Sequence, residues 1–364
     1  LAAMPMTGQL SMTEQYSEYT TRGTANLSSS DEGEKKEGLD RDYMLQYSMS
    51  RGEFWSMAIP NVKGGHLSWL DVEGGEKTYQ QLNRTALELG KSQDDMNRSG
   101  MYRFYWGAQS SSAGAFYFGA FAFALCLMWF LVGSSWLRWP LAFITIVAVV
   151  LSWKETSWMT DFFMDHVPLY TKFRDTKMML VLVQIVIPLG AALALHELIR
   201  PEAHKQWKKW IIGGGAVLAM QLLLLAAPQF WFDFDSPWFE MFGDHPILNQ
   251  VRELRVDAFR SDAIRSFGLT FLACAALLAL LKKWLQPQWI VAASIAIVAI
   301  EMVSVNSRYV NDEGKNSDYV STMDKRFPFT PSQADLRILE KEKGSILQAD
   351  FDAEVLAAQN RWKD

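Results

Sequence analysis

The sequence predicts an α-helical polytopic membrane protein with about six transmembrane helices. Three observations lead to this fold class. Residues 113–305 contain six long apolar runs, eleven of the 15 tryptophans lie between positions 129 and 289, and Lys and Arg are dense in the short loops on one side. A single apolar run would also fit a buried helix of a soluble protein, whereas six in succession indicate a membrane domain with an aromatic belt.

The six apolar runs approach the length of about 20 residues that a membrane-spanning helix needs. The shortest begins near Pro140, a residue that suits the first turn of a helix. Another begins with Gly213–Gly215, which would let a neighbouring helix approach closely. The predicted spans are 113–132, 139–153, 178–195, 211–231, 266–281 and 289–305.

A polar segment, residues 1–112, precedes the spans, and residues 306–364 are expected to begin a further domain that the chain does not finish. Residues 53–70 mix apolar side chains with a proline and a Gly-Gly pair, which predicts short strands or extended chain. Residues 76–91 carry apolar side chains at helical intervals and end near Gly90, which predicts a helix followed by a C′ glycine. The polar segment is therefore expected to have mixed secondary structure.

Two amphipathic helices are expected beside the spans. Residues 245–266 place Ile247, Val251 and Leu254 on one side, which predicts a helix lying on the outer membrane face. Residues 157–166 are a shorter candidate. Glu301 lies near the outer end of the sixth run, where we expect it to meet water, although a carboxylate within hydrocarbon would mark a functional site.

The cations of the short loops set the predicted topology. Loops rich in Lys and Arg stay on the cytoplasmic side, so residues 1–112 and the tail after 305 are placed outside. The two longer opposite loops hold eight Lys and Arg, so the prediction depends on the density of cations in the short loops rather than on totals. The cytoplasmic cations are Arg138, Arg200, Lys205, Lys208, Lys209, Lys282 and Lys283.

Composition and motifs exclude several functions. The net charge is −5 and long basic runs are absent, which argues against nucleic-acid binding. The sequence has none of the glycine-rich phosphate loops, zinc-protease motifs or nucleophile-elbow motifs of common soluble enzymes. Cys126 and Cys274 both lie in apolar runs, so neither a disulfide nor a thiolate metal site is expected. No cofactor is predicted.

The loop 154–177 carries the residue types most suited to chemistry. Its cations face outward, against the topology rule, and Arg and Lys together suit a phosphate-bearing substrate at the membrane surface. Its carboxylates suit a general base or a divalent ion, which leaves a metal open. Contact with lipid headgroups and ion pairing within the loop are the alternatives. The candidate substrate-binding residues are Lys172, Arg174, Lys177, Asp165 and His166.

Four stretches carry a resemblance to a known family. They are "LDRDYMLQYSMSRGEFWSMAIPNVKGG" (39–65), "YWGAQSSSAGAFYFGA" (105–120), "HVPLYTKFRDTKMMLVLVQIVIPLGAALAL" (166–195) and "RVDAFRSDAIRSF" (255–267). In these the chain resembles the YfhO-type bacterial membrane proteins, particularly Bacteroidetes-like members, over nearly its whole length and in the same order. That family is similar to GT-C glycosyltransferases, which transfer a sugar from a polyprenyl-phosphate carrier on the outer membrane face.

The resemblance implies a multi-pass protein of the bacterial inner membrane with large periplasmic segments. It implies a fragment that lacks the N-terminal half, where the catalytic acid of the family lies in the first outer loop, so no catalytic residue is assigned here. Lys172 and Arg174 correspond to a carrier-phosphate contact. Lys177 stands in a stretch where family members often have apolar or small residues, so the resemblance supports Arg174 more than Lys177.

The expected partners are the lipid bilayer, a polyprenyl-phosphate-linked sugar and an envelope glycan or lipid acceptor. Two other functions fit the same residues. A flippase or exporter of lipid-linked glycans would use the cations to hold phosphate without chemistry, and a non-catalytic scaffold would use the outer segments to assemble envelope proteins. The absence of an internal repeat in this sequence favours the enzyme over the transporter.

Overall fold

The computed structural model describes residues 39–65, 67–109, 116–155, 157–168, 170–172 and 174–309, together with residues 12, 333, 337 and 338. The chain divides into two compact units, Leu1–Val305 and Asn306–Asp364. Apart from the last residue of α13 and the short turn η6 (Ser307–Tyr309), every element named below belongs to the first unit.

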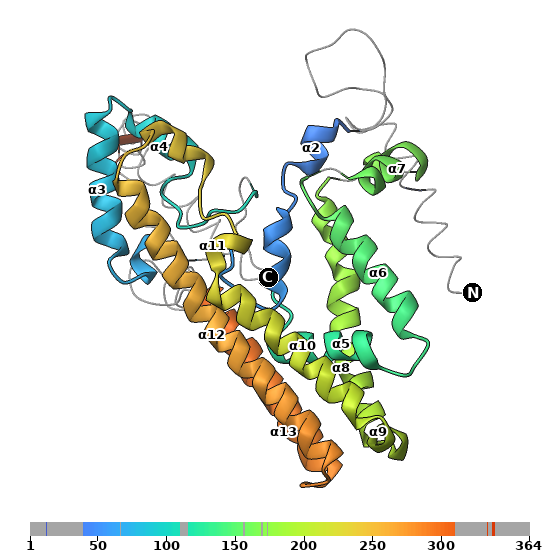
Figure 1. Cartoon of the computed structure of the whole chain (residues 1–364). Coiled ribbons are helices and arrows are strands. Elements are labelled where there is room, and N and C mark those ends of the chain that lie inside the picture. Colours follow the sequence, from blue (N-terminus) through green and yellow to red (C-terminus); the bar gives the residue numbers. More distant parts are fainter. Residues whose placement is uncertain are drawn as a thin grey trace, which may run out of the picture. The chain divides into compact units, whose positions relative to one another are not determined.

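Four helical segments are long and apolar enough to cross a membrane, which supports an α-helical membrane protein (Figure 1). Two further apolar helices, α5 (Ala120–Val132) and α6 (Arg138–Leu151), have 13 and 14 residues and fall short of the length of a full span. The count of six spans is therefore not confirmed. The four long segments contain α8 (Leu180–Ile199), α10 (Trp207–Ala226), α12 (Ile247–Leu281) and α13 (Pro287–Asn306).

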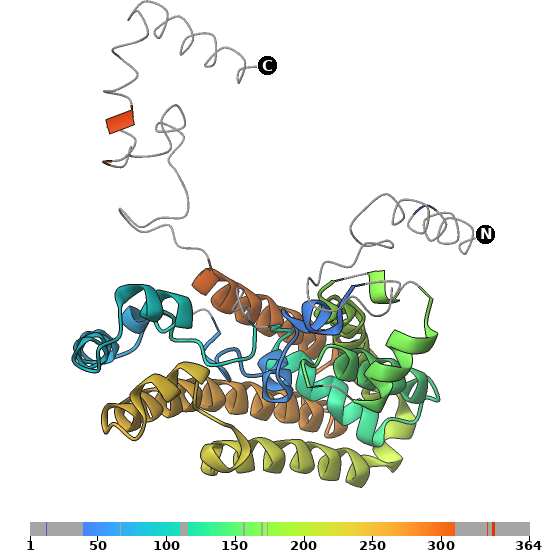
Figure 2. The same cartoon turned by 90° about the horizontal axis from the view of Figure 1, so that it is seen from above.

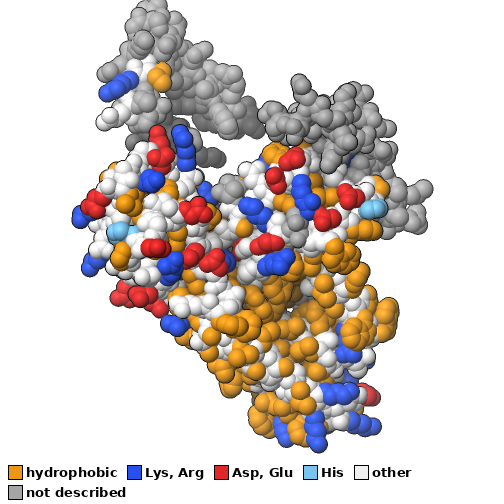
Figure 3. All heavy atoms as spheres, turned by 45° about the horizontal axis from the view of Figure 1, so that its top comes forward, with side chains coloured by type: hydrophobic (Ala, Val, Ile, Leu, Met, Phe, Trp, Pro, Cys, Tyr) orange, Lys and Arg blue, Asp and Glu red, His pale blue; other side chains and the backbone are white. Residues whose placement is uncertain are grey.

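The short helix α5 lies at the centre of the apolar part of the unit. It packs against α8, α10 and α12, and it supplies more buried residues to the first hydrophobic core than any other helix, among them Phe121, Leu125 and Trp129. Side chains on the outside of these helices are also apolar, among them Phe143 and Ile185. Figure 3 shows these hydrophobic side chains covering the lower part of the molecule, with charged side chains above them and at the lower tip. That distribution suits a bilayer.

The helix α12 joins what the sequence analysis treats as two elements. It runs unbroken for 35 residues, about 52 Å at the standard rise, whereas a bilayer core is about 30 Å thick (Figure 1). Its first half packs in the second hydrophobic core, with Trp69, Leu82 and Phe104, so its apolar side faces other parts of the protein. The sequence offers no proline to end the helix, and its first glycine is Gly268.

The polar segment before the spans consists of helices, turns and irregular chain where it is described, and the short strands expected among residues 53–70 are absent from its described residues. The 3₁₀ helices η1 (Arg51–Met57) and η2 (Trp69–Asp71) lie at the two ends of that stretch. A serine precedes each of them, and this serine and a carboxylate three residues later form hydrogen bonds with each other's backbone. Among the described residues the nearest approach to a sheet is an isolated bridge between Met49 and Trp153.

Helices follow these 3₁₀ turns. The structure confirms the predicted helix before Gly90 as α3 (Gly75–Glu88), and Gly90 itself has a φ of 75°. The helix α4 (Gln93–Ser99) comes next. Viewed from above, α3 and α4 lie at the side of the unit that holds the start of α12 (Figure 2).

Candidate functional site

The basic loop, residues 167–179, lies between α7 (Trp158–His166) and α8. The helix α7 confirms the second predicted helix. Within it are two short turns, η3 (Tyr170–Lys172) and η4 (Thr176–Met179). Residues 39–48, which include α2 (Arg41–Leu45), lie along the loop. The Leu39 amide donates to Thr171 O at 2.8 Å, and the hydroxyls of Ser48 and Thr176 are 2.8 Å apart. Segments more than 120 residues apart thus form one surface.

Arg174 and Lys177 come together around tyrosine rings supplied by that earlier segment. The Arg174 guanidinium lies 4.1 Å from the ring centre of Tyr47 and 4.6 Å from that of Tyr43, and it donates to the Tyr43 hydroxyl at 2.7 Å. The Lys177 ammonium lies 6.0 Å from the Tyr47 ring. Sequence reasoning missed these tyrosines, although their spacing of four residues would put both on one helical face.

Asp175, between the two cations, has an unusual backbone conformation. Its φ is 73°, a region that residues other than glycine rarely adopt, and its carboxylate lies 3.7 Å from the Lys177 ammonium. Ion pairing within the loop, one of the alternatives above, is therefore present for Lys177. Strained backbone of this kind occurs often at binding sites, where surrounding structure maintains it.

The remaining predicted residues take separate places. Lys172 is half-buried at the end of η3. His166 stacks on Phe162 one turn earlier, with ring centres 4.8 Å apart, and Asp165 is exposed on the same turn of α7. Asp161 of α7 pairs with Arg41 of α2. The structure thus groups Arg174 with Lys177, while His166 is engaged with its own helix.

A buried carboxylate, Glu53, stands behind the basic loop. Its oxygens accept hydrogen bonds from the Tyr105 hydroxyl at 2.5 Å and from the Gln109 amide nitrogen at 2.9 Å. The other end of the Gln109 amide accepts from Lys177 at 3.1 Å. Burial and the neighbouring Glu53 carboxylate raise the pKa of Tyr105 above its ordinary value, so this hydroxyl remains a donor. Glu53 therefore ties η1, the loop after Tyr105 and Lys177 into one network.

An apolar groove of ≈ 400 Å³ begins beside this network and runs between η1, α5, α6 and α8. Its lining follows α6 from Ala142 to Val150, about 12 Å at the rise of a helix, and continues to Trp153 just after the end of that helix. At the Trp153 end, the Arg51 guanidinium lies 5.5 Å from the indole ring. The indole N–H of Trp153 is buried and has no hydrogen-bond partner among the described residues, which is unusual for such a donor.

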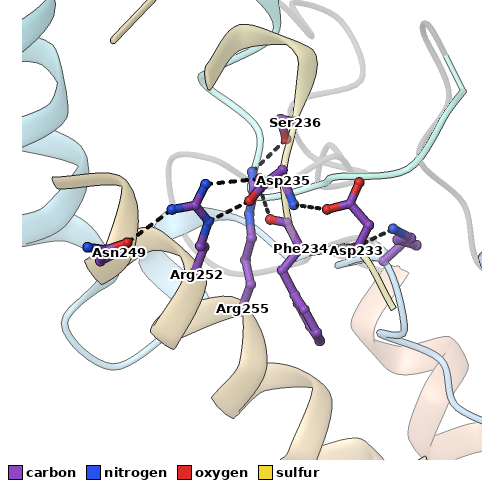
Figure 4. Close-up of polar contacts among 8 residues, drawn as sticks. Asp233, Phe234, Asp235, Ser236, Asn249, Arg252 and Arg255 are labelled. Atoms are coloured by element: carbon purple, nitrogen blue, oxygen red, sulfur yellow. Dashed lines mark hydrogen bonds and ion pairs between the residues drawn. The ribbon is translucent and has the colours of Figure 1, made fainter. Parts of the chain in front are cut away.

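A second polar centre, which the sequence analysis did not anticipate, surrounds Arg255 of α12 (Figure 4). The side chain is fully buried, and its guanidinium donates to Phe234 O at 2.6 Å and to the Ser236 hydroxyl at 2.8 Å. Three aromatic rings surround it, with centres 5.1–5.4 Å away. One turn earlier, Arg252 forms a two-pronged pair with Asp235. Both arginines hold residues 233–236 against α12.

The hydrogen bond from Arg252 lowers the pKa of Asp235 below its ordinary value. The same segment receives a buried lysine, because the Lys63 ammonium donates to Asp233 O at 2.5 Å. Burial lowers the pKa of Lys63 below its ordinary value. The sequence shows Arg255 as one of several arginines on a helix with both polar and apolar residues. That pattern does not distinguish Arg255 from its exposed neighbours.

Glu301 does not meet water, contrary to the expectation for an interfacial residue. It is 2% exposed, and its carboxylate accepts from the Tyr117 hydroxyl and from the backbone N–H of Ala120 at 2.5 Å. It therefore caps the first turn of α5 from a neighbouring helix. At the other end of α5, Glu197 of α8 accepts from the Trp129 indole at 2.8 Å and from the Ser134 backbone at 2.7 Å. Both glutamates satisfy donors that would otherwise lie unpaired beside hydrocarbon.

Among the described residues, no three His, Cys, Asp or Glu side chains lie close enough to form a metal site. Comparison with known proteins found no matching family model, no matching curated protein and no matching solved structure. The resemblance to YfhO-type proteins is therefore an expectation from the quoted residues alone.

Proposed function

We propose that the protein is a membrane glycosyltransferase of the GT-C type, which moves a sugar from a polyprenyl-phosphate donor to an envelope glycan or lipid on the periplasmic face of a bacterial inner membrane. The observation that carries the proposal is an apolar groove with Arg51 at its Trp153 end and, beside it, the network that includes Lys177. The groove would take the hydrocarbon of the carrier, and Arg51, Arg174 and Lys177 would meet its phosphate.

The chemistry of these cations supports a phosphate rather than a neutral ligand. A guanidinium donates forked hydrogen bonds to phosphate oxygens, and an ammonium supplies a point charge. The unpartnered indole N–H of Trp153 offers a further donor at the same end of the groove. In the proposed reaction these groups would stabilise the phosphate as it leaves the anomeric carbon.

The test measures sugar transfer in membranes that contain the protein expressed from its complete gene. Labelled sugar is followed from a polyprenyl-phosphate donor to lipid or glycan. Loss of two charged contacts in Arg174→Gln/Lys177→Gln is expected to lower transfer at least about tenfold at matched expression. Unchanged transfer in this variant would overturn the assigned phosphate contacts, and no transfer by the wild type with any of several donors would overturn the enzyme.

A second pair of variants tests the groove. Ala142→Phe fills it from α6, whereas Ile144→Phe adds a similar ring to the exposed side of the same helix. We expect only the first to impair transfer and binding of the lipid carrier. Equal activity in both would show that the carrier does not occupy the groove.

A further inference from the structure

We propose that a groove at the opposite end of the helices binds an anionic phospholipid of the cytoplasmic leaflet. It lies between the end of α8 and the turn that joins α12 to α13, and it has a volume of ≈ 430 Å³. Leu198 and Ile199 form one wall, and Lys283, Trp284 and Leu285 form the other. The site does not depend on the proposed glycosyltransferase function.

The charge around this groove is strongly positive. The loops 133–138, 196–210 and 282–286 contain seven Lys and Arg but only two acidic residues, Glu197 and Glu202. Glu197 is turned inward to Trp129 and the Ser134 backbone, so its charge is already engaged. At the lower tip in Figure 3, Lys and Arg side chains accordingly outnumber Asp and Glu. An anion is the complementary ligand.

Two of these cations, one of which precedes Lys283 in the chain, converge on one ring. The ammonium of Lys282 lies 5.7 Å from the centre of the Trp207 ring, and that of Lys208 lies 5.8 Å from it. Each contact is weakly favourable, but gathering like charges is unfavourable unless solvent or an anion offsets their repulsion. A lipid phosphate at this position would offset it.

Lys283 has an unusual backbone conformation for a residue other than glycine. It follows the C-cap of α12 with a φ of 54°, where the next amide, Trp284 N–H, donates to Ala279 O at 3.0 Å. Glycine is the usual residue at such a helix end because a side chain is strained there. A lysine stands there instead, and it is one of the residues that line the groove. A cation is therefore present at this position although its backbone conformation is unfavourable for a residue with a side chain, as happens at functional sites.

The walls identify the ligand as a lipid rather than a free anion. Trp284 and Leu285 are 69% and 58% exposed, and the lining also includes the buried side chains of Leu198 and Leu280. An acyl chain would cover these apolar surfaces, while inorganic phosphate would leave them in water. The positive-inside rule places this end in the cytoplasmic leaflet, where bacterial and eukaryotic membranes present anionic headgroups to basic pockets between helices.

The experiment measures lipid binding by the purified chain with native mass spectrometry. Phosphatidylglycerol and phosphatidylcholine with identical acyl chains are titrated in detergent. We expect tighter binding of phosphatidylglycerol, because each lysine near an anionic lipid contributes about 1 kcal/mol. The double variant Lys282→Gln/Lys283→Gln should therefore weaken that binding about 30-fold. Equal affinity for the two lipids in the wild type would overturn the proposal.

The matched control is Lys205→Gln/Lys209→Gln, which removes the same charge from the loop 196–210 without changing a residue of the groove lining. An equal loss in this variant would mean diffuse surface attraction and would also overturn the site. Lys283→Gly guards against misfolding, since glycine suits the turn; it should weaken phosphatidylglycerol binding about fivefold without lowering thermal stability. Displacement of the bound lipid by inorganic phosphate would show a free-anion site instead.

Discussion

Arg255 is expected to hold residues 233–236 far more strongly than Arg252 does, although only Arg252 forms an ion pair. Arg255 donates to Phe234 O and to the Ser236 hydroxyl, both of which belong to buried residues. Replacing it by methionine fills much of the same space but leaves both acceptors without a donor. Each buried unpaired group costs about 1–3 kcal/mol, so the loss is about 2–6 kcal/mol.

Part of that loss is offset, because a buried guanidinium is itself costly and the Nε of Arg255 has no hydrogen-bond partner in the part of the chain that the structure describes. We therefore expect a net effect of about 2–4 kcal/mol on local opening, which corresponds to about a 30- to 1,000-fold faster exchange of backbone amides. The Arg252–Asp235 pair has side chains that are 38% and 44% exposed. A pair of this kind contributes at most about 1 kcal/mol, so Arg252→Met should accelerate exchange about fivefold or less.

The assay is hydrogen–deuterium exchange with mass spectrometry on peptides that cover residues 230–240, in the same detergent for both variants. The two arginines lie three residues apart on one helix and contact the same segment, so each variant controls for the other. Faster exchange in Arg252→Met than in Arg255→Met would refute the reasoning, because it would mean that the exposed charge pair and not the buried donor network fixes the segment.

Two further predictions concern packing and pH. Gly190→Ala would place a Cβ well inside contact distance of the Cys126 sulfur, where α8 packs on α5, and overpacking of this kind costs about 1–3 kcal/mol. Thermal stability in detergent should fall, and Cys126→Ala should restore it, whereas an additive loss in the double variant would show that the two sites do not touch. The hydrogen bond from Arg252 lowers the pKa of Asp235 from an ordinary value of 3.8. The ionised Asp235 carboxylate therefore stabilises the folded state fully at pH values above 3.8, and this stabilisation is lost as the pH falls through the lower pKa of the folded state. Carbon-13 NMR of the labelled aspartate carboxyl should give a midpoint below 3.8 that moves up in Arg252→Met, and a wild-type midpoint at or above 3.8 would contradict the assigned hydrogen bond.

The candidate phosphate site could be predicted only in part. The residues of the basic loop stand out in the sequence because cations on the predicted outer side oppose the topology rule. The residues that surround this loop cannot be recognised in the sequence, since Tyr43 and Tyr47 lie about 130 positions earlier. Arg51 likewise reaches the groove only through its contact with Trp153. A linear pattern records which side chains are available, but it does not record which distant ring a guanidinium will meet.

Hydropathy and helical periodicity by themselves determined the class of this protein, its long apolar helices and the helix that ends before Gly90. These properties are sums over neighbouring residues, which the sequence displays directly. Only the tertiary structure decided that α12 continues from the second core into the membrane, and that Arg255 and Glu301 are buried. The burial of a charged side chain depends on partners such as Phe234 and Tyr117, which lie 21 and 184 positions away and which folding alone brings into hydrogen-bond reach.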